Sequence, residues 1–310
     1  MIPLIDRALL RGHDSFLANG IEERAFLMEV GDGHCFAIFN RPSDRAALSR
    51  GFVILHSHGD EFLNLRRMER AIGRSLARMG FPVLSFHRRG YGDSTGDLSQ
   101  TTLGTQEEDI AAAIDQLRAL GGVAEVGMVG VRLGALLTAA AVRGGQVDRL
   151  ILVNPVFRSE PYFKGLMKQT IGIRLVGAQV APQASVEEFL ETLTTRGEID
   201  LMGFPMYRTL YEDLAGLGDL ASDVGSLSGR ALVLEATRAT SVRGDLAAFT
   251  KSVEGNGGEC RVELVREPPG VKFGQKPFVF SADPTVFVDR QGPMLEDMAA
   301  LVEGWAHADV

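Results

Sequence analysis

The stretch from Val126 to Arg143 restricts the possible folds of this chain more than any other part of it. It reads VGMVGVRLGALLTAAAVR: an apolar, β-branched run breaks at Gly130-Val131-Arg132-Leu133-Gly134, and an Ala/Leu-rich helical pattern follows directly. Small residues two before and two after the apex are needed where a strained backbone joins a strand to a helix. The pattern is typical of a nucleophile elbow, and its apex here is Arg132.

Buried strands and amphipathic helices alternate along the first half of the chain. We expect strands at Arg50–His58, Phe81–Phe86 and Arg149–Val156, because these runs are apolar throughout. Apolar residues recur every three or four positions in Leu63–Met79 and Glu107–Leu120, which predicts helices. Strands separated by single helices indicate right-handed βαβ units and an α/β fold with a mostly parallel, doubly wound sheet.

Further strands are expected at the two ends of this sheet. Glu23–Glu29 and His34–Asn40 alternate across Gly31-Asp32-Gly33, which predicts a hairpin. Later strands are expected at Arg230–Glu235 and Arg261–Val265. Helices are expected near Leu246–Val253 and at Pro293–Ala306.

The pattern changes between residues 157 and 227. Helix-like stretches occupy Tyr162–Leu175, Ser185–Thr194 and Tyr207–Leu217, and we find no convincing strand among them. We therefore predict a helical cap, residues 157–227, over the carboxyl edge of the sheet. The core would comprise residues 1–156 and 228–310.

Composition excludes several classes of protein. The chain has 310 residues, 45% of them hydrophobic and 23% charged, and a net charge of −8, so nucleic acid is not an expected partner. Two cysteines far apart predict neither a disulfide framework nor a metal site, and no cofactor is expected. The start of the chain lacks the pattern of a signal peptide, and no apolar window is long enough to span a membrane. A cytoplasmic location is the expectation.

At this point the chain resembles the α/β-hydrolase superfamily over nearly its whole length. The features that carry the resemblance are His58-Gly59 after a strand, the loop RGYGDS at Arg89–Ser94, and the elbow. Three segments are most similar to the serine-aminopeptidase-like hydrolases of the second type associated with exosortase systems. These segments are Gly130–Leu137, Asn154–Gln169 and Leu201–Leu220. The resemblance implies the α/β-hydrolase fold with a helical cap.

Hydrolytic members of that fold use a nucleophile at the elbow, an acid after a late strand and a histidine before the last helix. Arg132 cannot attack a carbonyl, because its guanidinium stays protonated. None of the six histidines lies between the last expected strand and the last expected helix. Glu235 or Asp245 occupies the place of the acid. Serine-type hydrolysis is therefore not expected, unless a relocated nucleophile such as Ser57 replaces the elbow residue.

A cation at the apex creates an electrostatic demand. It opposes the helix macrodipole at a cost of about 0.3–1 kcal/mol, so an anionic partner is needed. The candidates are Glu235, Asp60, Glu61 or an anionic ligand. Two interpretations stay open. Arg132 could form an internal ion pair with Glu235 in a closed site, or it could lie at the bottom of an anion-binding pocket.

In the second interpretation the anion-binding pocket is inherited from an oxyanion hole. Backbone N–H groups of Leu133 and of the Gly59-Asp60 turn would join Arg132 around a carboxylate, an enolate or a carrier-linked acyl group. Lyase-like or cyclase-like chemistry would be possible, with His58 as the remaining acid/base. Arg89 is a candidate anion ligand, or else a brace of its own loop. Six apolar cap residues could line an acyl tunnel: Phe163, Leu166, Met167, Phe204, Met206 and Tyr211.

Three functional hypotheses follow. In the first, the protein binds a small or carrier-linked acyl or carboxylate compound without serine chemistry. In the second, it is a catalytically inactive homologue that pairs with a paralogous hydrolase or with a second copy of itself. In the third, it is an ester or amide hydrolase with a relocated nucleophile.

Overall fold

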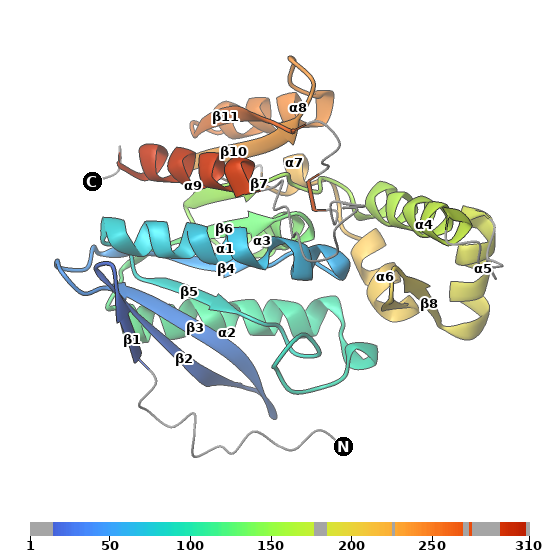
Figure 1. Cartoon of the computed structure of the whole chain (residues 1–310), viewed down its shortest axis with the longest axis horizontal. Coiled ribbons are helices and arrows are strands. Elements are labelled where there is room, and N and C mark those ends of the chain that lie inside the picture. The colour runs from blue at the N-terminus through green and yellow to red at the C-terminus, as the bar shows by residue number, and fades with distance from the viewer. Residues whose placement is uncertain (1–14, 177–184, 225–226, 269–272, 275–291, 308–310) are drawn as a thin grey trace, which may run out of the picture.

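A nine-stranded sheet forms the centre of the molecule (Figure 1). The computed structural model describes residues 15–176, 185–224, 227–268, 273–274 and 292–307. Within them the strand order is β1-β2-β3-β5-β4-β6-β7-β10-β11. The strands are β1 (Ser15–Ala18), β2 (Ile21–Val30), β3 (Gly33–Pro42), β4 (Arg50–Leu55), β5 (Val83–Phe86), β6 (Glu125–Val131), β7 (Arg149–Val153), β10 (Arg230–Thr237) and β11 (Glu259–Arg266).

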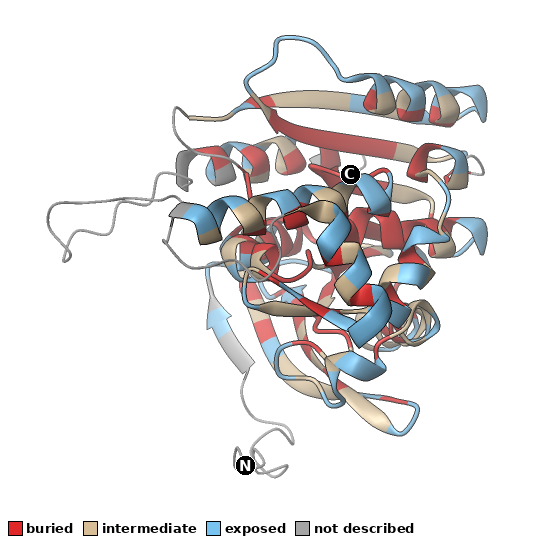
Figure 2. Ribbon diagram, turned by 90° about the vertical axis from the view of Figure 1, so that its right-hand side faces the viewer, coloured by how far each residue is buried: buried red, intermediate tan, exposed pale blue. Residues whose placement is uncertain are grey.

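The strands from β5 to β11 in that order run parallel, whereas β1, β2 and β3 pair antiparallel. This confirms the expected mostly parallel sheet. Helices α1 (Asp60–Met79) and α9 (Gly292–His307) cover one face, and α2 (Leu103–Gly121), α3 (Leu133–Arg143) and α8 (Gly244–Gly255) cover the other. Because both faces are covered, the central strands are buried along their length, as Figure 2 shows.

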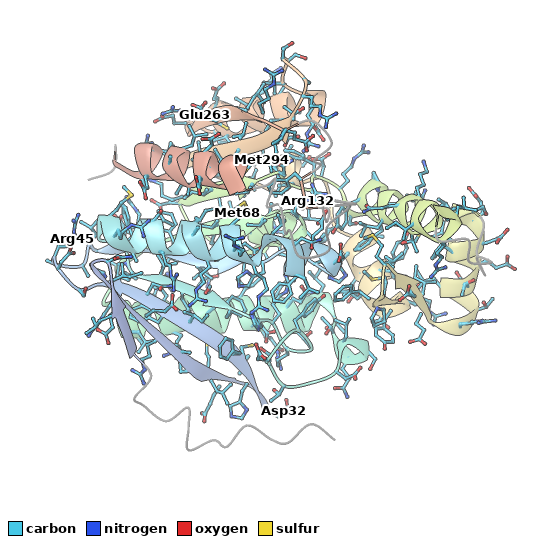
Figure 3. All side chains as sticks on the ribbon, in the orientation of Figure 1. Asp32, Arg45, Met68, Arg132, Glu263 and Met294 are labelled. Atoms are coloured by element: carbon cyan, nitrogen blue, oxygen red, sulfur yellow. The ribbon has the colours of Figure 1, made fainter. Side chains whose placement is uncertain are left out.

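Each face of the sheet has its own apolar core. Met68 of α1 and Met294 of α9 (Figure 3) lie in the same cluster. Trp305, near the end of α9, belongs to this cluster too. The opposite cluster joins α2, α3 and α8 to the sheet and continues into apolar side chains beyond β7. The two cores fix the positions of the strand ends, and so of the loops that follow them.

The elbow has the expected form. Arg132 lies between β6 and α3 with φ 53° and ψ −119°, a conformation that L-residues rarely adopt. A Cβ on Gly134 would lie 2.3 Å from the carbonyl oxygen of Leu55, and one on Gly130 would lie 2.5 Å from the Cα of Ala135. Both glycines are therefore required by the close approach of backbone to backbone.

The segment between β7 and β10 is mainly helical, but it also contains a hairpin that we did not predict. Its elements are α4 (Ser159–Val176), α5 (Val186–Arg196), β8 (Glu198–Leu201), β9 (Phe204–Tyr207), α6 (Arg208–Ala215) and α7 (Leu220–Asp223). The two-residue turn of the hairpin, Met202-Gly203, has positive φ at both positions. Such a turn normally carries Asn or Asp first, so the Met gave no sequence signal.

Two other elements begin earlier than predicted. Helix α1 starts at Asp60, directly after Gly59, and α2 starts at Leu103 because Thr102 and Thr105 form a capping box. The hairpin around Gly31-Asp32-Gly33 is confirmed. The weak helical pattern at Ile5–Leu10 lies outside the described residues.

We expect Gly134→Ala to destabilise the protein by about 1–3 kcal/mol or more, because the added methyl group has no room beside the Leu55 carbonyl. Gly165→Ala, in the exposed part of α4 where nothing lies within 4 Å of the added Cβ, is the matched control. It should be neutral or stabilising. Urea unfolding of both variants checks this, and equal midpoints would contradict the close packing at the elbow.

Candidate active site at the elbow

The carboxyl ends of four neighbouring strands carry most of the candidate residues. His58 follows β4, Arg132 follows β6, Asn154 follows β7, and Glu235 lies near the end of β10. In parallel sheets this edge is where ligands bind. Arg132 lies at this edge, toward helix α4 (Figure 3).

Arg132 is held on three sides. Its Nε donates to Oε1 of Glu61 over 2.9 Å, and its Nη1 donates to the carbonyl oxygen of Asn154 over 3.0 Å. The ring of Tyr162 lies 5.4 Å from the guanidinium carbon, within cation–π range. These contacts orient the cation, although its backbone is strained.

Glu61 is the anionic partner that the apex cation requires. It lies buried in the first turn of α1, where the helix macrodipole favours a negative charge. Its second oxygen, Oε2, accepts a hydrogen bond of 2.9 Å from the hydroxyl of Tyr162 in α4. Burial raises the pKa of Tyr162 well above its usual value, with the Glu61 charge adding to the effect, so the hydroxyl keeps its proton.

The third guanidinium nitrogen of Arg132 is left available. Nη2 makes no hydrogen bond with the part of the chain that the structure describes, and 20% of the side chain is exposed. Burial acts to lower the pKa of Arg132, but the Glu61 carboxylate outweighs it and the net shift is upward. Arg132 therefore presents a permanent positive charge and an unused donor at the edge of the sheet.

Glu235 does not pair with Arg132, contrary to one of our two interpretations. Its Oε1 lies 3.4 Å from Nε of Arg243, which precedes α8, while its Oε2 is buried without a hydrogen-bond partner. Burial raises the pKa of Glu235, against the opposing charges of Arg243 and Arg132. Glu61, and not Glu235, is the partner of Arg132, because α1 begins at Asp60 and brings the Glu61 carboxylate to the elbow.

His58 is enclosed by aromatic residues. Its Nδ1 lies 2.7 Å from the hydroxyl of Tyr91, and its ring packs against Phe163 of α4. Burial lowers the pKa of His58 to about 3, and the charge of Arg88 adds to the effect. The imidazole is neutral at ordinary pH, and no hydrogen bond joins it to Arg132 among the described residues.

The backbone groups predicted to hold an anion lie at two helix starts. Gly59, with φ 59° and ψ −132°, directly precedes α1, and Leu133 is the first residue of α3. N–H groups in a first helical turn have no partner inside the helix. The Asp60 carboxylate is engaged by Nδ2 of Asn64 over 2.8 Å. An anion role for these groups stays a prediction.

Arg89 acts as a brace of its own loop. Its Nε donates to Asp109 over 2.6 Å and its Nη2 to Glu108 over 2.7 Å, both in α2. The backbone N–H of Arg89 also donates to Asp109. These contacts turn the guanidinium toward α2, so the geometry gives no support to its other predicted role as an anion ligand.

Two site residues, Tyr162 and Asn154, did not stand out in the sequence, and a third, Arg88, stood out only as ending a strand beside the pocket. Tyr162 and Asn154 both contact Arg132, and Arg88 is a buried cation that is only 4% exposed. Arg88 donates from Nη2 to the Ser57 carbonyl over 3.3 Å and lies 4.8 Å from the Tyr91 ring, while its Nη1 has no partner. The sequence signals were slight: Asn154 follows a strand in an Asn-Pro pair, and Arg88 follows a strand directly.

The described residues contain no group of three or more His, Cys, Asp or Glu side chains that could hold a metal ion. Among the same residues, no helix combines the length and apolar character needed to cross a membrane.

Ser57, the candidate relocated nucleophile, is fully buried and donates from Oγ to Glu69 over 3.1 Å.

Replacing Arg132 with Ala should cost about 3–5 kcal/mol of stability, because it leaves Glu61 buried without a cation. The double variant Arg132→Ala/Glu61→Gln should recover part of that loss. Arg118→Ala removes an exposed ion pair of 3.5 Å on α2 and should change stability by less than about 1 kcal/mol. Chemical denaturation provides the free energies, and strictly additive losses would contradict the coupling.

We expect the free energy of unfolding to fall as the pH drops from about 6.5 toward 4.5. Burial lowers the pKa of both His58 and His87 to about 3, so the unfolded chain binds protons there that the folded chain does not. Each histidine contributes a slope of up to about 1.4 kcal/mol per pH unit. His58→Phe should remove roughly half of this slope, whereas His34→Phe at the hairpin is the control. An unchanged slope in His58→Phe would show that this residue is not buried in its neutral form.

The elbow, the strand order and the position of the cap segment can be compared with known proteins. A family model described as serine aminopeptidase, S33, matches residues 51–236, which is more than half of the chain. No curated protein matches this chain.

Solved structures share the fold at low sequence identity. Est1E from Butyrivibrio proteoclasticus, solved with ferulic acid bound, is 16% identical with a TM-score of 0.60, covering 92% of this chain and 98% of that one. Proline iminopeptidase from Mycobacterium smegmatis is 15% identical with a TM-score of 0.56, covering 92% and 98%. A putative hydrolase from Agrobacterium vitis S4 is 14% identical with a TM-score of 0.52, covering 92% and 99%. The chain has the α/β-hydrolase fold and belongs to the serine aminopeptidase (S33) family.

Proposed function

We propose that this protein binds a small or carrier-linked carboxylate or acyl compound at Arg132 and performs no serine-type hydrolysis. One observation carries the proposal: the apex cation is oriented by Glu61 and Asn154, yet its Nη2 donor is unused and a fifth of the side chain is exposed. A guanidinium in that state favours an oxyanion.

The absence of serine chemistry is supported by the residues that a triad would need. Arginine at the apex is not a nucleophile, and the sequence places no histidine between His87 and His307. Ser57 is fully buried with its hydroxyl bonded to Glu69, which argues against a relocated nucleophile. We infer that Arg132 stands where related hydrolases carry their serine.

The chemistry available at such a site is stabilisation of negative charge. Arg132 and the Leu133 N–H would both face an oxygen of the bound group, while Glu61 keeps the guanidinium from turning away. The Tyr91 hydroxyl can donate to Nδ1 of His58, which leaves the ring proton on Nε2 as a donor. His58 and Arg132 follow the neighbouring strands β4 and β6, and a neutral donor and a cation at adjacent strand ends suit an enolate, so a lyase-like or cyclase-like step is part of the proposal.

The cap residues support an apolar stem on the ligand. Phe163, Met167 and Met206 are buried in the cluster that joins the cap segment to the sheet, and Phe204 lies 3.8 Å from the position of a Cβ on Gly59. We propose that the acyl chain lies against this apolar surface. An association with exosortase systems belongs to the same proposal and rests on the resemblance of the cap and elbow segments. A cytoplasmic location is proposed as well, because the sequence has no apolar window long enough to span a membrane.

Thermal stabilisation and calorimetry with octanoate, octanoyl pantetheine and octanol test the binding. We expect octanoate and octanoyl pantetheine to bind saturably and raise Tm, while octanol has little effect because it lacks an oxyanion or a polarised carbonyl. Arg132→Gln should weaken octanoate binding by about tenfold or more, because a charge-assisted bond is lost. Arg118→Gln on α2 is the control.

A fluorophosphonate probe and a panel of aryl esters test the chemistry. We expect neither labelling nor saturable turnover. Stoichiometric labelling, or ester turnover unchanged in Arg132→Gln, would contradict the proposal. Failure of every acyl ligand, together with a stable complex with a paralogous hydrolase, would instead support the hypothesis of an inactive partner.

A further inference from the structure

A cavity lies away from the elbow, between α1 and the strands β3 and β5. Its volume is about 240 Å³, and its wall includes Arg66 of α1, Phe36 and Ile38 of β3, and Ser85, Phe86 and His87 of β5 and the residue after it. Among the described residues, no hydrogen bond, ion pair or ring contact joins this wall to Arg132.

His87 supplies an unused donor in the wall of this cavity. The side chain is 95% buried, since the residue is 5% exposed. The backbone N–H of Asp93 donates to Nδ1 of His87 over 3.2 Å, so the proton of the neutral ring lies on Nε2. That Nε2–H has no hydrogen-bond partner among the described residues, and it lies on the side of the ring away from Asp93. Because the ring lines the cavity, an acceptor on a ligand there could receive the Nε2 proton.

Arg66 supplies a cation without a carboxylate. Its guanidinium lies 5.5 Å from the Phe62 ring, and it forms no ion pair with the described residues. Two further arginines of α1, Arg70 and Arg74, share the single carboxylate of Glu23. This edge of the cavity therefore carries more positive than negative charge, although the chain as a whole carries −8.

Two carboxylates lie near the cavity, Asp93 and Glu69. Oδ2 of Asp93 lies 3.4 Å from Nδ1 of His87, on the opposite side of the ring from Nε2. Glu69 is fully buried and accepts from His56 over 2.7 Å and from the Ser57 hydroxyl over 3.1 Å. Burial, with the charges of His56, Arg66 and Arg88, lowers the pKa of His87 to about 3. The ring therefore stays neutral and keeps the Nε2 proton as a donor over the physiological range.

The size and the walls restrict what fits. Because a water molecule takes about 30 Å³ in the liquid, the cavity holds roughly eight waters or a molecule of similar size. Phe36, Ile38 and Phe86 make one side apolar, so the ligand would combine an oxyanion with a short apolar group.

We propose that this cavity binds a small oxyanion, a phosphate ester or a carboxylate, carried on a short apolar group. Arg66 would pair with the anionic oxygens and the Nε2–H of His87 would donate to one of them, while the apolar part would lie against Phe36 and Phe86. The site is independent of the elbow and does not require the proposed function there.

Isothermal titration of the full chain with phenyl phosphate, benzoate and benzyl alcohol tests this site. Phenyl phosphate and benzoate should distinguish the two kinds of oxyanion, and at least one of them should bind with a stoichiometry near one. Arg66→Met keeps the stem over Phe62 but removes the charge, and it should weaken that binding by about tenfold or more. Ser85→Leu should abolish binding by filling the cavity, and it sacrifices only a weak hydroxyl contact of 3.5 Å.

Two controls keep the outcomes separate. Arg118→Met on α2 should bind like the unmodified protein. Arg132→Gln weakens any binding of benzoate at the elbow, so the binding that remains in it should still fall when Arg66→Met is added. Circular dichroism verifies that each variant is folded. The proposal is overturned if neither oxyanion binds saturably, if benzyl alcohol binds equally well, or if affinity falls in Arg132→Gln but not in Arg66→Met and Ser85→Leu.

Discussion

The interaction on which the elbow region depends is the buried contact between Arg132 and Glu61. A cation at the start of α3 opposes the macrodipole of that helix, and a carboxylate at the start of α1 is favoured by the dipole of its own. The ion pair therefore offsets the unfavourable interaction of Arg132 with the macrodipole of α3, and it involves a carboxylate that the macrodipole of α1 already stabilises. Tyr162 of α4 then completes the network by donating to Glu61. One ion pair thus links the sheet, α1, α3 and the cap segment.

The fold could be predicted from the sequence because its signals are local and repeated. Apolar strands alternating with amphipathic helices indicated the parallel sheet. Gly130 and Gly134 indicated the elbow, where a Cβ at either position would meet backbone atoms. The β8–β9 hairpin was missed because Met202 adopts a positive φ that its side chain does not favour. Propensity is a weak guide where a turn is imposed by the packing around it.

The site was only partly predictable, because its key contact joins residues 71 positions apart in the chain. The sequence required an anion for Arg132 and offered Glu235, Asp60 and Glu61 without a means of choosing. The choice depends on where α1 begins and on the direction that Glu235 takes toward Arg243. Tyr162 could not be selected from sequence either, since an aromatic residue in a cap helix usually serves packing alone.

We propose that the protein orients Arg132 so that it can bind an anion that the protein does not itself provide. The most direct measurement is a crystal structure of the protein soaked with octanoate. We expect a carboxylate oxygen of octanoate within hydrogen-bond distance of Nη2 of Arg132, with Glu61 still bonded to Nε. A structure in which octanoate is bound elsewhere but not at the elbow would contradict this proposal. The Arg132–Glu61 pair would then have a structural role only.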